Sequence, residues 1–132
     1  MGRFKSIEEA REYFKNDLFA MQAGVQLDEM WEGGCICSMP VQDMLKNAAG
    51  SVMGGAIFTL ADFAFAAAAN HAHRTTVAQQ VSINFLSGTR GTRLFAKAQC
   101  KKDGKTTCVY NIDVTDDLGR DIAQFVGTGY KL

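Results

Sequence analysis

One apolar segment constrains the fold more than any other part of the chain. Residues 50–70 read GSVMGGAIFTLADFAFAAAAN and contain a single carboxylate, Asp62, among alanine, phenylalanine, leucine and isoleucine. A pair of glycines opens this run, and its alanine and leucine content predicts a helix over 54–70. Because the helix is apolar on every side apart from Thr59 and Asp62, we expect it in the core of the protein. An ionised carboxylate loses hydration there, so the position of Asp62 needs an explanation.

The segments before this helix predict a short helix and two strands. The capping-box spacing that starts at Ser6 predicts an amphipathic helix over about 7–16. From 18 to 39 the pattern is strand-like and interrupted by glycines. Alternate residues from 31 to 39 would lie on one face of a half-buried strand: Trp31, Gly33, Cys35, Cys37 and Met39. The only proline, Pro40, is expected to end that strand, and 43–52 is interpreted as a loop.

After the long helix the hydrophobic period changes to two, which indicates strands. Four strands are expected, at 81–85, 94–101, 108–114 and 122–130. The Asp-Gly pair at 103–104 and the Asp-Asp-Leu-Gly sequence at 116–119 are turn signals, so we expect hairpins to join the strands. This order predicts one α+β domain over 1–132, with an N-terminal helical segment over 1–17 and an antiparallel β-sheet wrapped around a long central α-helix.

Charge and composition argue against several classes of function. Fourteen lysines and arginines balance fourteen aspartates and glutamates, so no net field attracts nucleic acid or an anionic membrane. The apolar run at 56–69 is too short to span a bilayer, and it carries Asp62. The first residues are too charged for a secretory signal peptide, so we expect a cytoplasmic protein with four reduced cysteines. No metal is expected, because His71 and His73 are the only histidines and tetrahedral-site spacings are absent.

Two features of the long helix have chemical interpretations. The cluster of Gly50, Gly54 and Gly55 is not a phosphate-binding loop, because no Gly-Lys-Ser/Thr follows it. A helix N-terminus nevertheless presents unpaired N–H groups to a ligand oxygen, and the alternative is that the glycines serve close packing. Asp62 lies two turns further on and on roughly the same side. It is either a general base or nucleophile with a raised pKa, or a structural carboxylate satisfied by a neighbour or by solvent.

The stretch from Asn47 to Asp62, NAAGSVMGGAIFTLAD, resembles the signature of hotdog-fold acyl-CoA thioesterases of the PaaI-like (phenylacetic-acid-degradation) branch. The matching positions are Asn47, Gly50, Gly54, Gly55, Leu60, Ala61 and Asp62. Segments at 81–86, 101–105 and 127–130 are also similar, and the resemblance extends over roughly 18–131. It implies a hotdog fold, in which the sheet wraps around the helix. It also implies a homodimer or homotetramer with active sites between subunits.

The resemblance further implies roles for individual residues. Asp62 would act as the base or nucleophile at the thioester carbonyl, and the backbone N–H of Gly54 would be the oxyanion donor. Asn47 would help to hold the carbonyl or the water, and these two groups would face Asp62 of the other subunit. No metal or redox cofactor is implied, because coenzyme A enters only as part of the substrate. The expected function is hydrolysis of an acyl- or aryl-CoA to free acid and CoA.

One departure from the family pattern is Met53, which stands where the family usually has a histidine before the glycine pair. Methionine cannot donate a hydrogen bond, so the alternative function is a non-catalytic module that binds or senses acyl-CoA. A dehydratase or hydratase is a weaker third interpretation, because both histidines follow the long helix. Further substrate-binding candidates are Gly55 at the helix start, Gln79, Gln80 and Ser82 on the next strand, and, for the CoA phosphates, Arg90, Arg93, Lys101, Lys102 and Lys105.

Overall fold

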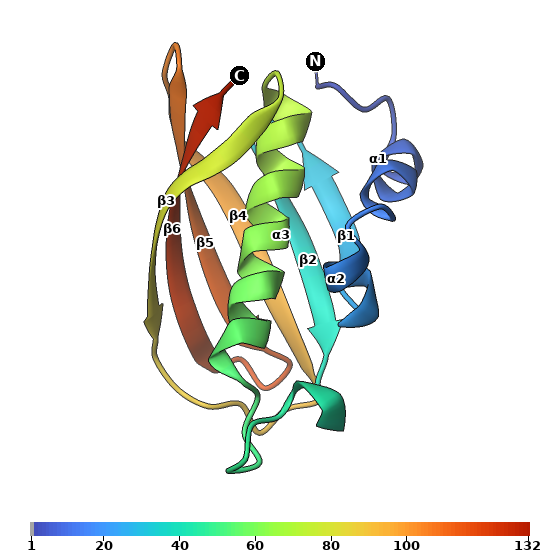
Figure 1. The fold of residues 1–132 in the computed structure, drawn as a ribbon, viewed down its shortest axis with the longest axis vertical. Coiled ribbons are helices and arrows are strands. Elements are labelled where there is room, and N and C mark those ends of the chain that lie inside the picture. The colour runs from blue at the N-terminus through green and yellow to red at the C-terminus, as the bar shows by residue number, and fades with distance from the viewer. Residues whose placement is uncertain (1) are drawn as a thin grey trace.

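A computed structural model describes residues 2–132 as a curved antiparallel sheet around one long helix (Figure 1). The helices are α1 (Ile7–Phe14), α2 (Leu18–Gln22) and α3 (Gly54–Ala72), and a 3-10 turn spans Asp43–Leu45. The strands are β1 (Gln26–Trp31), β2 (Gly34–Pro40), β3 (Thr76–Phe85), β4 (Arg93–Asp103), β5 (Thr107–Asp116) and β6 (Asp121–Lys131). They form one six-stranded sheet in the order β1-β2-β4-β5-β6-β3, so β1 and β3 are its edges. The predicted α+β architecture is confirmed.

The N-terminal segment contains one predicted helix and one that the sequence pattern missed. The side chain of Ser6 accepts a hydrogen bond from the N–H of Glu9 at 3.1 Å, as the predicted capping box requires. The strand-like interpretation of 18–22 is wrong, because these residues form α2. Their sequence, Leu-Phe-Ala-Met-Gln, is rich in good helix formers. Gly24, with φ of +86°, then turns the chain into β1.

The four strands after α3 are confirmed, but only some of the predicted hairpins form. Turns join β4 to β5 and β5 to β6, and the inward face of β5 is buried at Cys108, Tyr110, Ile112 and Val114. The predicted hairpin between the first two of these strands is wrong, because β3 pairs with β6 instead of β4. After α3 the chain forms β3, which pairs with β6 at the edge of the sheet. The loop at 86–92 then crosses to β4 in the middle of the sheet.

The long helix α3 lies against the concave face of the sheet, as predicted, and extends two residues beyond the expected end (Figure 1). Leu60, Ala61 and Ala64 are fully buried, and the ring of Phe65 packs edge-on against Tyr110 at 5.7 Å. Glycines on β6 permit this close approach: a Cβ at Gly129 would lie 2.9 Å from Phe65. The expected core position of α3 is confirmed, although one stripe of its surface faces away from the sheet and is only partly covered.

Candidate active site

Asn47 shapes the loop that leads into α3. Its Oδ1 accepts hydrogen bonds from the N–H groups of Ala49 at 3.0 Å and Ser51 at 3.1 Å. Gly50 completes this turn with φ of +85°, a conformation that favours glycine. The side-chain oxygen of Asn47 is therefore committed to the fold. Its Nδ2 amide remains as the group that can donate to a ligand.

The first two residues of α3 present free hydrogen-bond donors. Met53 occupies the N-cap position, and its carbonyl accepts from the N–H groups of Ala56 at 2.9 Å and Ile57 at 3.2 Å. Within residues 2–132, the N–H groups of Gly54 and Gly55 have no acceptor, and no side chain caps the helix. These donors and the helix dipole make this end of α3 a place for a ligand oxygen that carries or develops negative charge.

Asp62 lies on the partly covered stripe of α3 and lines a cavity of about 330 Å³ between α2 and α3. The cavity lining is Asp17, Leu18, Phe19, Ala20, Phe58, Thr59, Asp62, Phe63 and Ala66. Burial raises the pKa of the Asp62 carboxyl above 3.8, and the nearby charge of Asp17 raises it further. Loss of hydration also raises the pKa of Asp17, although that residue remains exposed overall.

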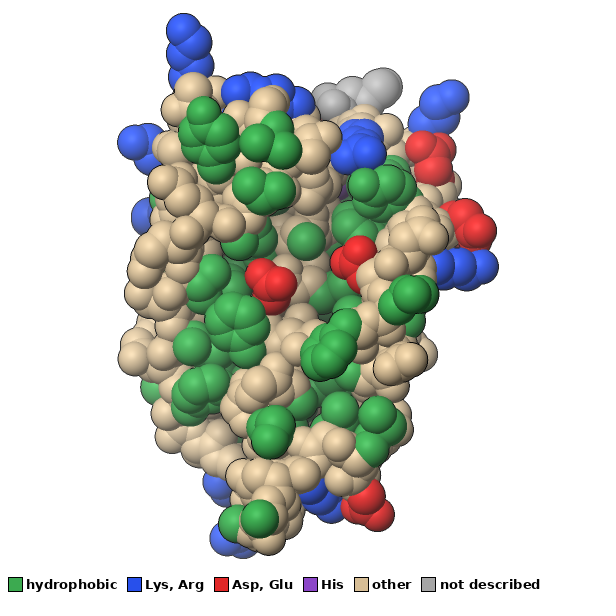
Figure 2. Space-filling model, in the orientation of Figure 1, with side chains coloured by type: hydrophobic (Ala, Val, Ile, Leu, Met, Phe, Trp, Pro, Cys, Tyr) green, Lys and Arg blue, Asp and Glu red, His purple; other side chains and the backbone are tan. Residues whose placement is uncertain are grey.

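A second cavity, of about 220 Å³, adjoins the first and shares Phe19 and Thr59 with it. Its other lining residues are Gln22, Ala23, Met44, Leu45, Lys46, Met53, Gly55 and Ala56. We call the two cavities together the α2–α3 groove. Several large apolar side chains around it are unusually exposed: Leu18 (70%), Phe19 (77%), Met44 (66%) and Met53 (52%). Figure 2 shows hydrophobic side chains over this face of the molecule, with acidic groups set among them. The groove is apolar and negatively charged at one end.

A single chain does not bring Asp62 to the donors at the start of α3. Asp62 follows Gly54 by eight residues, which corresponds to about 12 Å along a helix axis. Asp62 and Gly55 do share the partly covered stripe, so both groups open onto the α2–α3 groove. Of the predicted catalytic residues, the structure therefore places Asn47 and Gly54 at one end of the helix and Asp62 two turns away.

The candidates on β3 lie outside the groove of their own chain. A Cβ at Gly127 would lie 3.0 Å from Phe65, so Gly127 and its strand partner Val81 face α3. The alternating residues Gln80 and Ser82 therefore belong to the opposite face of the sheet. Gln79 lies in a bulge at which the register with β6 shifts. The side chains of Gln79, Gln80 and Ser82 are all exposed.

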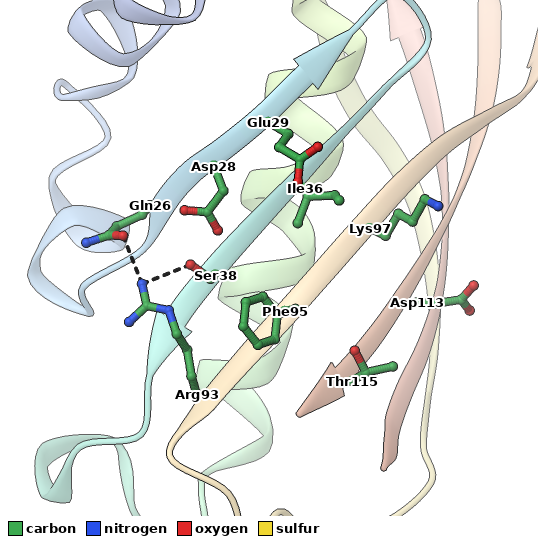
Figure 3. Close-up of a pocket in the computed structure, with 10 residues that line it drawn as sticks. All are labelled: Gln26, Asp28, Glu29, Ile36, Ser38, Arg93, Phe95, Lys97, Asp113 and Thr115. Carbon is green, nitrogen blue, oxygen red and sulfur yellow. Dashed lines mark hydrogen bonds between the residues drawn. The ribbon is translucent and has the colours of Figure 1, made fainter. Parts of the chain in front are cut away.

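The basic candidates do not form one cluster in the chain. Arg90 lies in the loop before β4 and Lys101 lies near the opposite end of that strand, and both are exposed. Arg93 lies in a cavity of about 570 Å³ on the face of the sheet away from α3 (Figure 3). Its guanidinium donates to Gln26 Oε1 and Ser38 Oγ, both at 2.9 Å. This outer cavity is separate from the α2–α3 groove.

The two histidines serve packing at the far end of α3. His71 Nδ1 accepts from the N–H of Phe4 at 3.2 Å, and His73 Nε2 lies 3.0 Å from the hydroxyl of Tyr110. Burial lowers the pKa of both imidazoles. Within the part of the chain that the structure describes, no three acidic, histidine or cysteine side chains converge on a metal position. The described helices include none long and apolar enough to cross a membrane.

Asp17 is the residue of this groove that the sequence analysis missed. It immediately precedes α2, where an aspartate is a common helix-start signal. That signal becomes visible only when 18–22 is recognised as a helix.

Comparisons with known proteins identify the family of this chain. Residues 49–123 match the thioesterase superfamily. The chain is 34% identical to the acyl-coenzyme A thioesterase PaaI of Escherichia coli over 129 residues, which cover 97% of this chain and 92% of the relative. The solved structure of E. coli PaaI, from the phenylacetic acid degradation operon, matches with a TM-score of 0.89 over 95% of this chain and 91% of that one, at 32% identity.

Two related structures contain coenzyme A or its acetyl ester. A hypothetical thioesterase from Streptococcus pneumoniae, solved with coenzyme A, matches with a TM-score of 0.81 and 27% identity over 89% of this chain and 94% of that one. A Streptococcus mutans protein bound to acetyl-CoA matches with a TM-score of 0.77 and 29% identity over 80% of this chain and 86% of that one.

Proposed function

This chain belongs to the thioesterase superfamily and has the hotdog fold, and on that premise we propose that it is an acyl-CoA thioesterase that hydrolyses an acyl- or aryl-CoA to free acid and CoA. The observation that carries the proposal is that α3 presents free N–H donors at its first turn and, two turns further on, a carboxylate of raised pKa. The similarity to E. coli PaaI and to relatives solved with CoA or acetyl-CoA supports the choice of substrate.

The proposed chemistry uses the first turn of α3 and Asp62. The N–H groups of Gly54 and Gly55, with Asn47 Nδ2 nearby, would receive the thioester oxygen as it gains negative charge. In one route Asp62 takes a proton from water, whose oxygen attacks the carbonyl carbon. In the other, Asp62 attacks directly, and water then hydrolyses the mixed anhydride. In both routes the carbon–sulfur bond breaks and CoA leaves as a thiolate that takes up a proton.

We further propose that two copies of the chain build each site. The separation of about 12 Å between Gly54 and Asp62 in one chain favours Asp62 of one copy facing Gly54 and Asn47 of the other. The long edge strand β3 supports such an assembly, because it pairs with β6 on one side only. Phe85 and Leu86, at the end of this strand, are more than half exposed. An unpaired apolar edge is a natural place for a second copy, as a dimer or within a tetramer.

The α2–α3 groove suits the acyl part of the substrate, because Phe19, Met44 and Met53 offer it exposed apolar surface. Arg90 and Lys101, which are far apart in one chain, remain candidates for CoA phosphates on different copies. The four cysteines are free thiols, which fits a reducing compartment such as the cytoplasm.

Met53 favours a second candidate function. Its thioether stands at the N-cap of α3, beside the proposed oxyanion donors, and offers no hydrogen to the substrate. A site of this kind that binds acyl-CoA without hydrolysing it would be a receptor for the thioester.

Thiol release from a panel of short-chain, medium-chain and aryl-CoA thioesters tests the proposed function. We expect turnover with at least one substrate that has a neutral, apolar acyl group, because the groove is apolar and has carboxylates at one end. Equilibrium binding of a non-hydrolysable thioether analogue is measured in parallel. Binding without thiol release would support the receptor function, and neither binding nor release would refute both.

A further inference from the structure

Asp17 places a second carboxylate in the cavity of Asp62. It stands at the N-cap of α2, where an aspartate usually accepts a hydrogen bond from the helix N–H groups. Here its side chain makes no capping hydrogen bond. Within residues 2–132, neither Asp17 nor Asp62 has a side-chain hydrogen bond or an ion pair. Both line the same cavity between α2 and α3, so the charge of each carboxylate can affect the protonation of the other.

No described cation neutralises this pair. Asp17 and Asp62 are the only titratable side chains among those that line the cavity. Arg11 and Lys15 of α1 line a different cavity that shares only Phe63 with this one. Lys46, in the other half of the α2–α3 groove, pairs with Asp43 at 3.2 Å. Lys15 pairs with Glu12 at 2.8 Å. Arg11 Nε donates to the carbonyl of Leu27 at 2.8 Å.

The sheet side of α3 supplies no charge either. Asp62 lies on the stripe that faces away from the sheet, and the buried residues next to it on α3, Ala61, Phe63 and Phe65, are apolar. Two like charges that line one partly buried cavity repel each other, so the charge of Asp17 raises the affinity of the Asp62 carboxylate for a proton.

We propose that Asp17 is a positioning residue of the reaction: it acts through Asp62, making that carboxylate a stronger proton acceptor at neutral pH. This role rests on the proposed thioesterase function. An ordinary carboxylate is a weak base at neutral pH, and a neighbouring negative charge increases its affinity for the proton that it must remove from water. The sequence Asn-Asp before α2 would then have a functional reason, because it brings this charge to the groove.

The substitution Asp17→Asn tests the proposal, because it removes the charge and keeps the shape. Titration of the Asp62 carboxyl carbon by NMR should show a lower midpoint in this variant than in the wild type. The acid limb of the kcat/KM profile should move to lower pH by the same amount. The conservative Asp17→Glu variant should restore both midpoints toward the wild-type values. Asp113→Asn is the matched control, since this exposed residue lies on the opposite face of the sheet (Figure 3).

The NMR measurement does not require turnover, so it can refute the role of Asp17 independently of the thioesterase function. Absence of thiol release from the wild type would refute the thioesterase function and leave the Asp62 titration to decide whether the pair is coupled. An Asp62 midpoint that is the same in the wild type, Asp17→Asn and Asp113→Asn would overturn the role of Asp17. A shift of the NMR midpoint with an unchanged kcat/KM profile would also overturn it, because Asp17 would then not act on the reaction.

Discussion

Replacing Asp62 with asparagine should lower kcat for thiol release by about 100- to 10 000-fold, the range associated with loss of a general base. Asparagine has nearly the shape of aspartate but neither accepts a proton from water nor attacks the carbonyl. Binding of a thioether analogue should persist, because asparagine keeps the shape of the α2–α3 groove and the donors of Gly54 and Gly55 are unchanged. Steady-state kinetics and analogue binding measure the two effects. Retention of near wild-type kcat would show that Asp62 is neither the base nor the nucleophile of the reaction.

The same substitution should stabilise the folded protein at neutral pH. The folded-state pKa of Asp62 is raised above 3.8, so the native state holds this proton more tightly than the unfolded state does. Stability therefore falls as pH rises from 3.8 through the raised pKa, and the full penalty is present above it. Asparagine carries no such penalty. The melting temperature of Asp62→Asn should exceed that of the wild type at pH 7, and the difference should vanish below pH 3.8. A lower melting temperature at pH 7 would contradict this account.

Replacing Gly54 with proline should reduce kcat by about 100- to 1000-fold, as expected when one oxyanion donor is lost. Gly54 is the first residue of α3, a position at which proline is well tolerated because the N–H makes no helix hydrogen bond. Met53 already has φ of −62° and ψ of 140°, within the extended region that a following proline requires. The substitution thus removes the proposed donor and leaves the helix able to form.

Gly54→Ala is the control for the added bulk. A Cβ at this position lies 3.1 Å from the ring of Phe85, which is 53% exposed and has room to shift. Alanine adds this Cβ and keeps the N–H, so it should retain most of the activity that proline loses. Circular dichroism and melting curves report whether both variants fold. An equal loss of kcat in the two variants would assign the effect to bulk and reject the N–H as an oxyanion donor.

Local patterns in the sequence are sufficient to predict most of the elements. The helix at 54–72 and the buried face of β5 follow from residues that are neighbours along the chain, where periodicity reports burial directly. Periodicity does not predict the short helix α2, because five residues contain little more than one helical turn. Periodicity does not predict the pairing of β3 with β6 either, since that contact joins segments about 45 residues apart and depends on how the sheet closes around α3.

Some residues of the candidate site could be predicted from the sequence and others could not. Asn47, Gly54 and Asp62 lie within sixteen residues, so their spacing could be recognised in the sequence. Asp17 could not, because its contact with the cavity of Asp62 depends on the packing of α2 against α3. The orientation of Gln80 and Ser82 could not be predicted either. A bulge beside Gln79 changes the register of β3, so counting alternate residues does not show which face they occupy.

Asp62 of one copy should work with Gly54 of another, and mixed dimers test this shared site. Chains carrying Asp62→Asn and Gly54→Pro are co-expressed with different affinity tags, and dimers that contain both are isolated through the two tags in turn. Each homodimer should be nearly inactive. If the site is shared, one of the two sites in a mixed dimer has both groups intact, so thiol release should return to about half of the wild-type rate per dimer. If mixed dimers are as inactive as the two homodimers, both groups must come from the same chain, and the shared site is wrong.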